Sequence, residues 1–348
     1  PRRIALVSST HWKECYVCRK SASLQTAGLR STVMTSRYSP TMLGAGSALI
    51  AVFAFSVNDT AIKFLSDGYA LHEIVLIRSL IGLIFLTTLV IPFSGGFRAL
   101  KTRRLGMHLL RGACVVFANI TFFLGLASLP LAEGVAVFFI SPLLITAFSV
   151  IFLKEHVGPR RWAAIGIGLV GVVIILRPGT DAFRMAAILP MVAAVGYAAL
   201  HMLTRYIGRT ESAAAMSFYI QVTFVFVAAA FGLMIGDGKF AGSADPSLEF
   251  MFRAWSWPPL SDLPILILVG LASAMGGFFI SYAYRNAAAA IVAPFEYVAL
   301  PLSILWGITV FDEWPDAIAL GGIALILASG LYMIWRERQV PEAEVPET

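Results

Sequence analysis

The chain has 348 residues, of which 58% are hydrophobic and only 13% are charged. Soluble domains carry about 25% charged residues, so this composition and the mean hydropathy of +0.81 exclude an ordinary soluble fold and predict an all-α integral membrane protein. The net charge of +6 would suggest nucleic acid as a partner of a soluble protein, but here the Lys and Arg residues mostly lie between apolar segments, so we expect no nucleic-acid binding.

The first 41 residues form a polar, basic tail that we expect to be disordered and cytoplasmic. No apolar run in it reaches the length of a signal-peptide core. Cys15 and Cys18 form a CxxC pair with His11 upstream, but a zinc site needs four ligands and no second pair follows. We therefore predict neither a metal nor a cofactor. The chain begins with Pro1, and Met34 or Met42 would suit the start of the first helix better.

Ten apolar segments follow the tail, most of them close to the roughly 20 residues that a helix needs to cross the hydrocarbon core. Their expected bounds are 42–65, 71–91, 106–127, 131–152, 161–177, 185–205, 213–235, 261–284, 288–310 and 316–335. A short tail, 337–348, ends the chain. The long loop 236–260 carries Trp255 and Trp257, which we interpret as anchors at the membrane interface or as a lip over the outer mouth.

The distribution of basic residues predicts the orientation. With the N-terminus inside, nineteen of the 26 Lys and Arg residues lie on the inner side, four on the outer side and three inside the spans. Because basic loops stay in the cytoplasm, both termini are expected there.

Two parts of the chain resemble each other. ISPLLITAFSVIFLKE (140–155) and ALPLSILWGITVFDE (299–313) each hold a proline, Pro142 or Pro301, 12 or 13 residues before a glutamate, Glu155 or Glu313. A Gly-rich apolar segment follows each glutamate. Five helices per half is an odd number, so the second half must enter the membrane upside down. The sequence therefore predicts a 5+5 inverted repeat with halves at 42–179 and 180–336, which is typical of secondary transporters.

These features resemble the drug/metabolite transporter superfamily, and within it the EamA-type transporters with two tandem five-helix repeats. The resemblance extends over about 42–336 and is carried by Arg78, by the small-residue run Ala287–Ala290 before Pro294, and by two turns and the glycines after them. The turns are Leu153-Lys154-Glu155 and Phe311-Asp312-Glu313, and the glycines are Gly166, Gly168, Gly171, Gly321, Gly322 and Gly330.

The resemblance implies a bacterial inner-membrane carrier that moves a small metabolite by alternating access without ATP. Substrates in the family include amino acids, amines, riboflavin and S-adenosylmethionine, and the shared motifs do not specify which applies here. Proton coupling and a homodimer stay open. The alternatives are an integral-membrane enzyme and a scaffold or sensor. The sequence lacks GxSxG, HExxH and a clustered set of histidines, so we expect no enzyme.

Charged residues at membrane depth are the candidate functional residues. From the span ends, Asp59 and Arg78 both lie roughly 10 Å below the outer surface, so they could pair, with Asn58 and Lys63 beside them. This group is interpreted either as an outer gate or substrate site, or as a structural ion pair between the first two helices.

Glu296 lies about 12 Å deep in the ninth span, and the matching place in the fourth span, near Phe138, holds no carboxylate. We interpret Glu296 as a proton carrier or as a counter-ion for a cationic substrate. The alternative is a protonated structural Glu that bonds to a neighbouring helix.

Asn119, Tyr297 and Tyr282 complete the candidate substrate-binding or coupling set, together with Glu296, Asp59, Arg78 and Asn58. The amide can bond to a neighbouring helix, and the aromatic rings can serve as packing or stack on a planar or cationic ligand. Arg111 is interpreted as an inner-face anchor and His201 as an interfacial group.

Overall fold

The computed structural model describes residues 40–153, 158–180, 184–207, 211–286, 292 and 295–337. Several sequence-based predictions concern residues outside these ranges: the basic tail with its CxxC pair, Glu155, the run Ala287–Ala290, Pro294 and the last residues of the chain.

The described part of the chain is all-helical and contains no β-strand. The longer helices are α2 (Pro40–Leu65), α3 (Leu71–Phe85), α5 (Leu105–Ser128), α8 (Pro159–Leu176), α9 (Ile188–Ile207), α10 (Ala213–Ile235), α12 (Leu263–Asn286) and α15 (Ala317–Glu337). The shorter ones are α4 (Ile91–Phe93), α6 (Leu131–Phe138), α7 (Ser141–Leu153), α11 (Pro246–Phe252) and α14 (Ala299–Phe311), with π turn η1 (Leu86–Val90) and 3-10 turns η2 (Phe97–Leu100) and η3 (Met185–Ala187).

Seven of the described helical stretches are long and apolar enough to cross a membrane, and three shorter apolar helices accompany them. The seven start at Met42, Leu71, Leu105, Leu131, Met185, Ala213 and Leu263. The shorter ones are Trp162–Leu176, Ala299–Phe311 and Ala317–Tyr332. The chain is therefore a multi-pass membrane protein, as its composition predicted.

The apolar segment expected over 131–152 is interrupted in the structure. Helix α6 ends at Phe138 and α7 begins at Ser141. Pro142 is the cause, because proline has no N–H to donate to the preceding turn and its ring clashes there, while it fits well in the first turn of a new helix. Pro301 likewise lies in the first turn of α14, after a turn at Tyr297 and Val298.

The two interrupted segments match in position. Helices α7 and α14 have 13 residues each and begin at Ser141 and Ala299, 158 residues apart. The residues in their breaks meet, because the rings of Phe139 and Tyr297 lie 5.3 Å apart. Buried apolar residues from both segments belong to the main core of the bundle.

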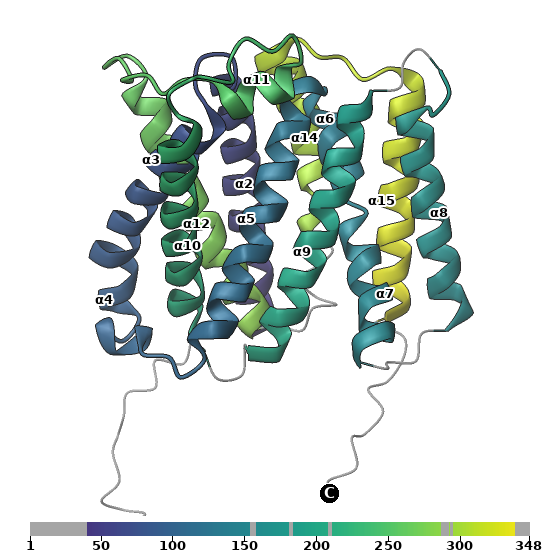
Figure 1. Cartoon of the computed structure of the whole chain (residues 1–348). Coiled ribbons are helices and arrows are strands. Elements are labelled where there is room, and N and C mark those ends of the chain that lie inside the picture. Colours follow the sequence, from purple (N-terminus) through teal and green to yellow (C-terminus); the bar gives the residue numbers. More distant parts are fainter. Residues whose placement is uncertain are drawn as a thin grey trace, which may run out of the picture. The chain divides into compact units, whose positions relative to one another are not determined.

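Helices distant in sequence lie side by side in the bundle (Figure 1): α2 with α12, α5 with α9, and α8 with α15. The α8–α15 contact depends on glycine. A Cβ on Gly171 would lie 2.9 Å from the carbonyl oxygen of Gly322, and a Cβ on Gly322 would lie 2.8 Å from that of Gly171. Only the absence of side chains lets the two backbones approach this closely.

Polar contacts tie the helices together at the end of the bundle that carries α11, which we call the α11 end. Lys63 at the end of α2 forms an ion pair of 2.8 Å with Glu313, just after α14. The second oxygen of Glu313 accepts from the N–H of Leu131 at 2.7 Å. Lys63 also donates to the carbonyl of Leu129. These contacts join α2, α14 and the start of α6.

The loop between α10 and α12 folds over the α11 end. Trp255 fills the space above Gly232 and donates to His72, whereas Trp257 is 98% exposed. The N–H groups of Gly242 and Ser243 donate to Glu249 and hold the pKa of that carboxyl below its usual range.

Candidate functional site

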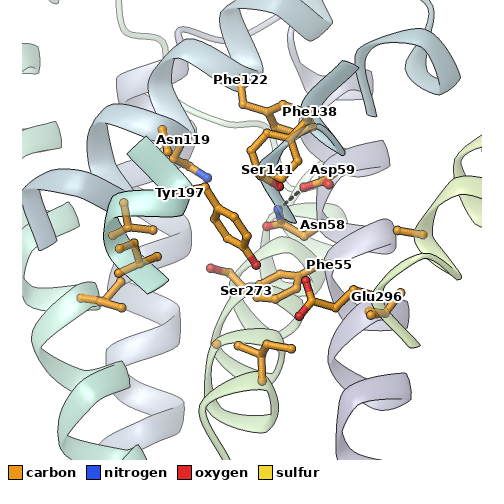
Figure 2. A pocket seen from close by; sticks show the side chains of 18 of the residues that line it. Phe55, Asn58, Asp59, Asn119, Phe122, Phe138, Ser141, Tyr197, Ser273 and Glu296 are labelled. Carbon is orange, nitrogen blue, oxygen red and sulfur yellow. Dashed lines mark hydrogen bonds between the residues drawn. The ribbon is translucent and has the colours of Figure 1, made fainter. Parts of the chain in front are cut away.

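A cavity of about 220 Å3 lies in the middle of the bundle. Its lining comes from α2, α3, α5, α6, α9, α10 and α12, from Ser141 at the start of α7, and from the segment that runs through Glu296 into α14. Apolar and aromatic rings make most of the wall, and a small set of charged and polar side chains faces the same space (Figure 2). Such a mixture is typical of a small-molecule binding site.

Asp59 and Arg78 both line the cavity, but they form no direct ion pair. Asn58 lies between them: its amide nitrogen donates to Asp59 at 3.0 Å, and its oxygen accepts from Arg78 at 3.4 Å. Asn119 on α5 accepts a second hydrogen bond from the guanidinium. The predicted Asp59–Arg78 pair is therefore an extended network, in which an amide separates the two charges.

Arg78 is held rigidly, with 2% of its surface exposed. Its guanidinium lies over the ring of Phe224 at 4.8 Å and near that of Phe123 at 5.7 Å. Cation–π contacts of this kind stabilise a guanidinium where water is absent. Lys63, expected beside Asp59, instead points to Glu313 at the α11 end.

Glu296 reaches the cavity and accepts a hydrogen bond from Tyr284 on α12. No Lys, Arg or His of the described chain forms an ion pair with it. Within the described chain, its carboxyl therefore has a hydroxyl as its hydrogen-bond partner and faces the cavity, without a paired cation. This is the arrangement expected of a group that binds a proton or a cationic ligand.

Two aromatic side chains on α9, Tyr197 and His201, line the cavity wall near Glu296. His201 stacks edge-on against Tyr197 at 4.3 Å and Tyr284 at 5.3 Å. Tyr197 also contacts Phe138 at 5.1 Å. Figure 2 shows Tyr197 and Glu296 entering the cavity from different elements, with Phe122 and Phe138 at one end of it. The rings offer flat surfaces to a planar ligand.

Two predictions about α5 and α9 were wrong. Arg111 is not an anchor at the surface: it is 2% exposed, lines the cavity and donates from Nε to the Thr204 hydroxyl at 3.0 Å. His201 faces the cavity as well. Depth counted from the span ends placed both residues near the interface, but it could not show that α5 and α9 pack together and turn these side chains inward.

Two candidates lie away from the cavity. Tyr297 is 2% exposed and packs against Phe139, with its hydroxyl where Gly330 has no side chain. Tyr282 lies beside Phe278, with ring centroids 6.2 Å apart, and does not line the cavity. Sequence reasoning missed Tyr197, although its spacing of four from His201 puts both on one helix face.

The described residues contain no group of three or more His, Cys, Asp or Glu side chains placed to hold a metal ion. The cavity offers groups suited to recognising a ligand: two carboxylates, two guanidinium groups, amides, hydroxyls and aromatic faces around a space of metabolite size.

Known transporters share sequence similarity with this chain. Residues 42–177 match the EamA-like transporter family. The S-adenosylmethionine uptake transporter of Rickettsia felis is 27% identical over 298 residues, which cover 86% of this chain and 94% of the relative. The riboflavin transporter of Brucella anthropi is 31% identical over 247 residues, covering 71% of this chain and 82% of the relative.

A second riboflavin transporter, from Rhizobium johnstonii, is 28% identical over 309 residues, covering 89% of this chain and 96% of the relative. A solved crystal structure with 17% sequence identity superposes with a TM-score of 0.59, covering 88% of this chain and all of the other. That likeness concerns the fold alone.

Proposed function

Because the chain belongs to the EamA-like transporter family, we propose that it is a secondary transporter that carries a small metabolite across the bacterial inner membrane by alternating access. The observation that carries this proposal is the central cavity, where Asp59, Arg78 and Glu296 face one space of metabolite size. Charged groups at membrane depth are costly and are retained where they contact a substrate or a coupling ion.

The proposed mechanism uses two inverted five-helix repeats, 42–179 and 180–336. The 158-residue offset between α7 and α14 supports this division, and α8 and α15 begin at the same offset, at Pro159 and Ala317. The helix pairs α5–α9 and α12–α2 are also equivalent under such a repeat, since each joins the third helix of one half to the first helix of the other. Rocking of one repeat against the other would expose the cavity to each side in turn.

We place both termini in the cytoplasm, which makes the α11 end the outer one. The excess of Lys and Arg in the loops at the opposite end supports this orientation. In this arrangement the Lys63–Glu313 contact closes the outer side of the cavity.

The proposed substrate is a cationic or zwitterionic metabolite with an aromatic ring, and S-adenosylmethionine is the first candidate. The carboxylates of Asp59 and Glu296 favour a cation, and the rings of Phe122, Phe138 and Tyr197 favour a planar group. Riboflavin is the second candidate, because two of the relatives carry that name and the same rings suit a flavin. Glu296 is the proposed coupling group, exchanging a proton as the substrate binds and leaves.

A thermal-shift measurement on the purified protein tests this function. We expect S-adenosylmethionine to raise the melting temperature in a concentration-dependent way, because a ligand that binds only the folded state stabilises it. Asp59→Asn should weaken that effect, whereas Asp237→Asn, at an exposed loop position, should not. Stabilisation by riboflavin alone would select the second candidate. No stabilisation by S-adenosylmethionine, riboflavin or a panel of amino acids and amines would count against the proposed substrate class.

A further inference from the structure

Arg111 is a buried cation that lacks a counter-charge. It is 2% exposed, and Nη1 has no hydrogen-bond partner in the described part of the chain. The structure shows no ion pair to its guanidinium in the described ranges. A buried charge without a partner costs several kcal/mol, so a protein retains one only where something else compensates it.

Two other cations in the bundle are compensated differently. Lys63 has Glu313, and Arg78 has two amide acceptors, two aromatic rings and a link through Asn58 to Asp59. Arg111 has a single hydroxyl acceptor, that of Thr204. Its charge is therefore the one that the described residues leave unbalanced.

Thr204 fixes the direction of the guanidinium. Its hydroxyl accepts from Nε of Arg111 and donates to the carbonyl of Leu200 at 2.7 Å. The hydroxyl therefore orients Arg111, and its own proton is already donated to Leu200. On the other edge of the guanidinium, Nη1 is left without a protein acceptor in the described chain, while the side chain lines the cavity.

The titratable groups around Arg111 add no negative charge. His201 lines the same part of the cavity and stacks on Tyr284, which leads to Glu296. His108, one helical turn before Arg111, lies 3.2 Å from Glu211, and that carboxylate also accepts from Thr102. Glu211 is thus used by His108 and Thr102, and neither carboxylate that the described chain places on the cavity wall, Asp59 or Glu296, forms an ion pair with Arg111.

We propose that Arg111 is an anion subsite of the transport cavity, which binds the carboxylate of a zwitterionic metabolite through the guanidinium edge that carries Nη1. This inference rests on the proposed transport function and deepens it. The planar fork of a guanidinium suits the two oxygens of a carboxylate. The ligand then lies with its carboxylate on Arg111, between α5 and α9, and its cationic group toward Asp59 or Glu296.

Matched ligands test the subsite. S-adenosylmethionine and S-adenosylmethioninamine carry the same sulfonium, amine and adenine, but the second lacks the carboxylate. We expect the full-length wild-type protein to bind the first at least about tenfold more tightly, about 1.4 kcal/mol at that ratio. Arg111→Gln should bring the two dissociation constants to within about twofold by weakening only the carboxylate form. Arg111→Lys, which keeps the charge without the fork, should leave an intermediate preference.

Further variants keep the test decisive if Arg111→Gln does not fold. Thr204→Val leaves the charge and removes the acceptor that orients it, so the preference for the carboxylate should fall severalfold. Thr121→Val is the control for Thr204, because the Thr121 hydroxyl bonds only to its own helix. Arg103→Gln, at an exposed position in the turn before α5, is the control for lost charge. Both controls should keep the wild-type preference.

The results distinguish failure of the anion subsite from failure of the proposed substrate class. Equal binding of the two compounds by the wild type, or a preference that survives both Arg111→Gln and Thr204→Val, overturns the anion subsite and leaves the transport function standing. Binding of riboflavin alone also overturns the subsite, because riboflavin has no carboxylate. If neither compound of the pair, nor riboflavin, nor any member of the panel of amino acids and amines binds, the proposed substrate class falls together with the subsite.

Discussion

Glu296 lines the cavity, and in the described chain its carboxyl group is hydrogen-bonded to a hydroxyl and is not paired with a cation. Tyr284 donates to it, and the nearest wall is aromatic. An ion pair would fix the charge of the carboxylate, whereas a hydroxyl partner leaves it free to take up a proton or to meet a cationic ligand. This local arrangement is the reason to assign coupling to Glu296.

If Glu296 couples protons to substrate, Glu296→Gln should abolish accumulation driven by a pH gradient and retain exchange of labelled for unlabelled substrate. The amide keeps the shape of the side chain but cannot carry a proton. Uptake into proteoliposomes measures both activities. Glu249→Gln, in the loop at the α11 end, is the matched control and should behave as the wild type. Gradient-driven accumulation by Glu296→Gln would refute the coupling role.

Asn58 is hydrogen-bonded to both Asp59 and Arg78 and so connects the two residues. Asn58→Leu keeps the number and branching of the side-chain heavy atoms and removes both hydrogen bonds, so a buried guanidinium loses one of its two amide acceptors. We expect a loss of about 1–3 kcal/mol of stability and weaker substrate binding, measured by thermal unfolding. Thr60→Val on the same helix removes a hydroxyl that bonds only to the carbonyl of Ser56 and should cost less. Equal effects of the two variants would argue against a network.

At the scale of elements, the contact between α8 and α15 is set by glycine. Gly171→Leu would place a side chain against the backbone of Gly322 and force the helices apart, at about 1–3 kcal/mol for an overpacked site. A Cβ on Gly166, in the same helix, would meet nothing within 4 Å, so Gly166→Leu is the control. We expect a lower melting temperature for the first variant only. Similar melting temperatures would contradict the close approach.

We expect the polar contacts of Glu313 to hold the α11 end of the cavity shut. Glu313→Gln removes the ion pair to Lys63 and should shift the population toward states open at that end. Val135 lines the cavity from α6. Val135→Cys, made in a variant whose native cysteines have been replaced, reports this shift. Its reaction with a membrane-impermeant maleimide, added from the α11 side, should become severalfold faster.

Asp316→Asn is the control for that experiment, because it breaks an exposed contact with Arg177 at the same end of the bundle. It should leave the rate of labelling unchanged. An unchanged rate in Glu313→Gln as well would show that the Lys63–Glu313 contact does not close the cavity.

Sequence reasoning worked best for elements whose cause is local. Apolar runs predicted the helices. Pro142 and Pro301 mark the interruptions, because each lies in the first turn of a new helix. The spacing of Asp59, Arg78 and Glu296 from span ends indicated residues at depth, and all three line the cavity. The direct Asp59–Arg78 pair was wrong because the neighbouring amide of Asn58 could not be oriented from sequence.

Tertiary partners explain the other differences. Arg111 and Thr204 are 93 residues apart, and only the packing of α5 on α9 shows that the arginine faces inward. Tyr297 looked like a site residue because it follows Glu296, yet adjacent residues on a helical segment point in different directions, and it packs on Phe139 instead. Contacts between helices that are far apart in the sequence decide such cases, and they leave no local pattern.

At the scale of the whole molecule, the central claim is that substrate passes through the cavity between the helices. Ser273 is a small residue on α12 that faces this space (Figure 2). Ser273→Trp would fill much of it, whereas Val173→Trp adds the same side chain on α8 at a position that is 52% exposed on the outside of the bundle. Both variants should remain folded in the membrane, which a thermal-unfolding measurement can verify.

The most direct test is uptake of labelled S-adenosylmethionine, or of whichever metabolite stabilises the protein, into proteoliposomes that contain these two variants or the wild type. We expect Ser273→Trp to reduce uptake to the level of empty vesicles and Val173→Trp to retain the wild-type rate. Wild-type uptake by a folded Ser273→Trp protein would contradict the claim that this cavity is the transport path.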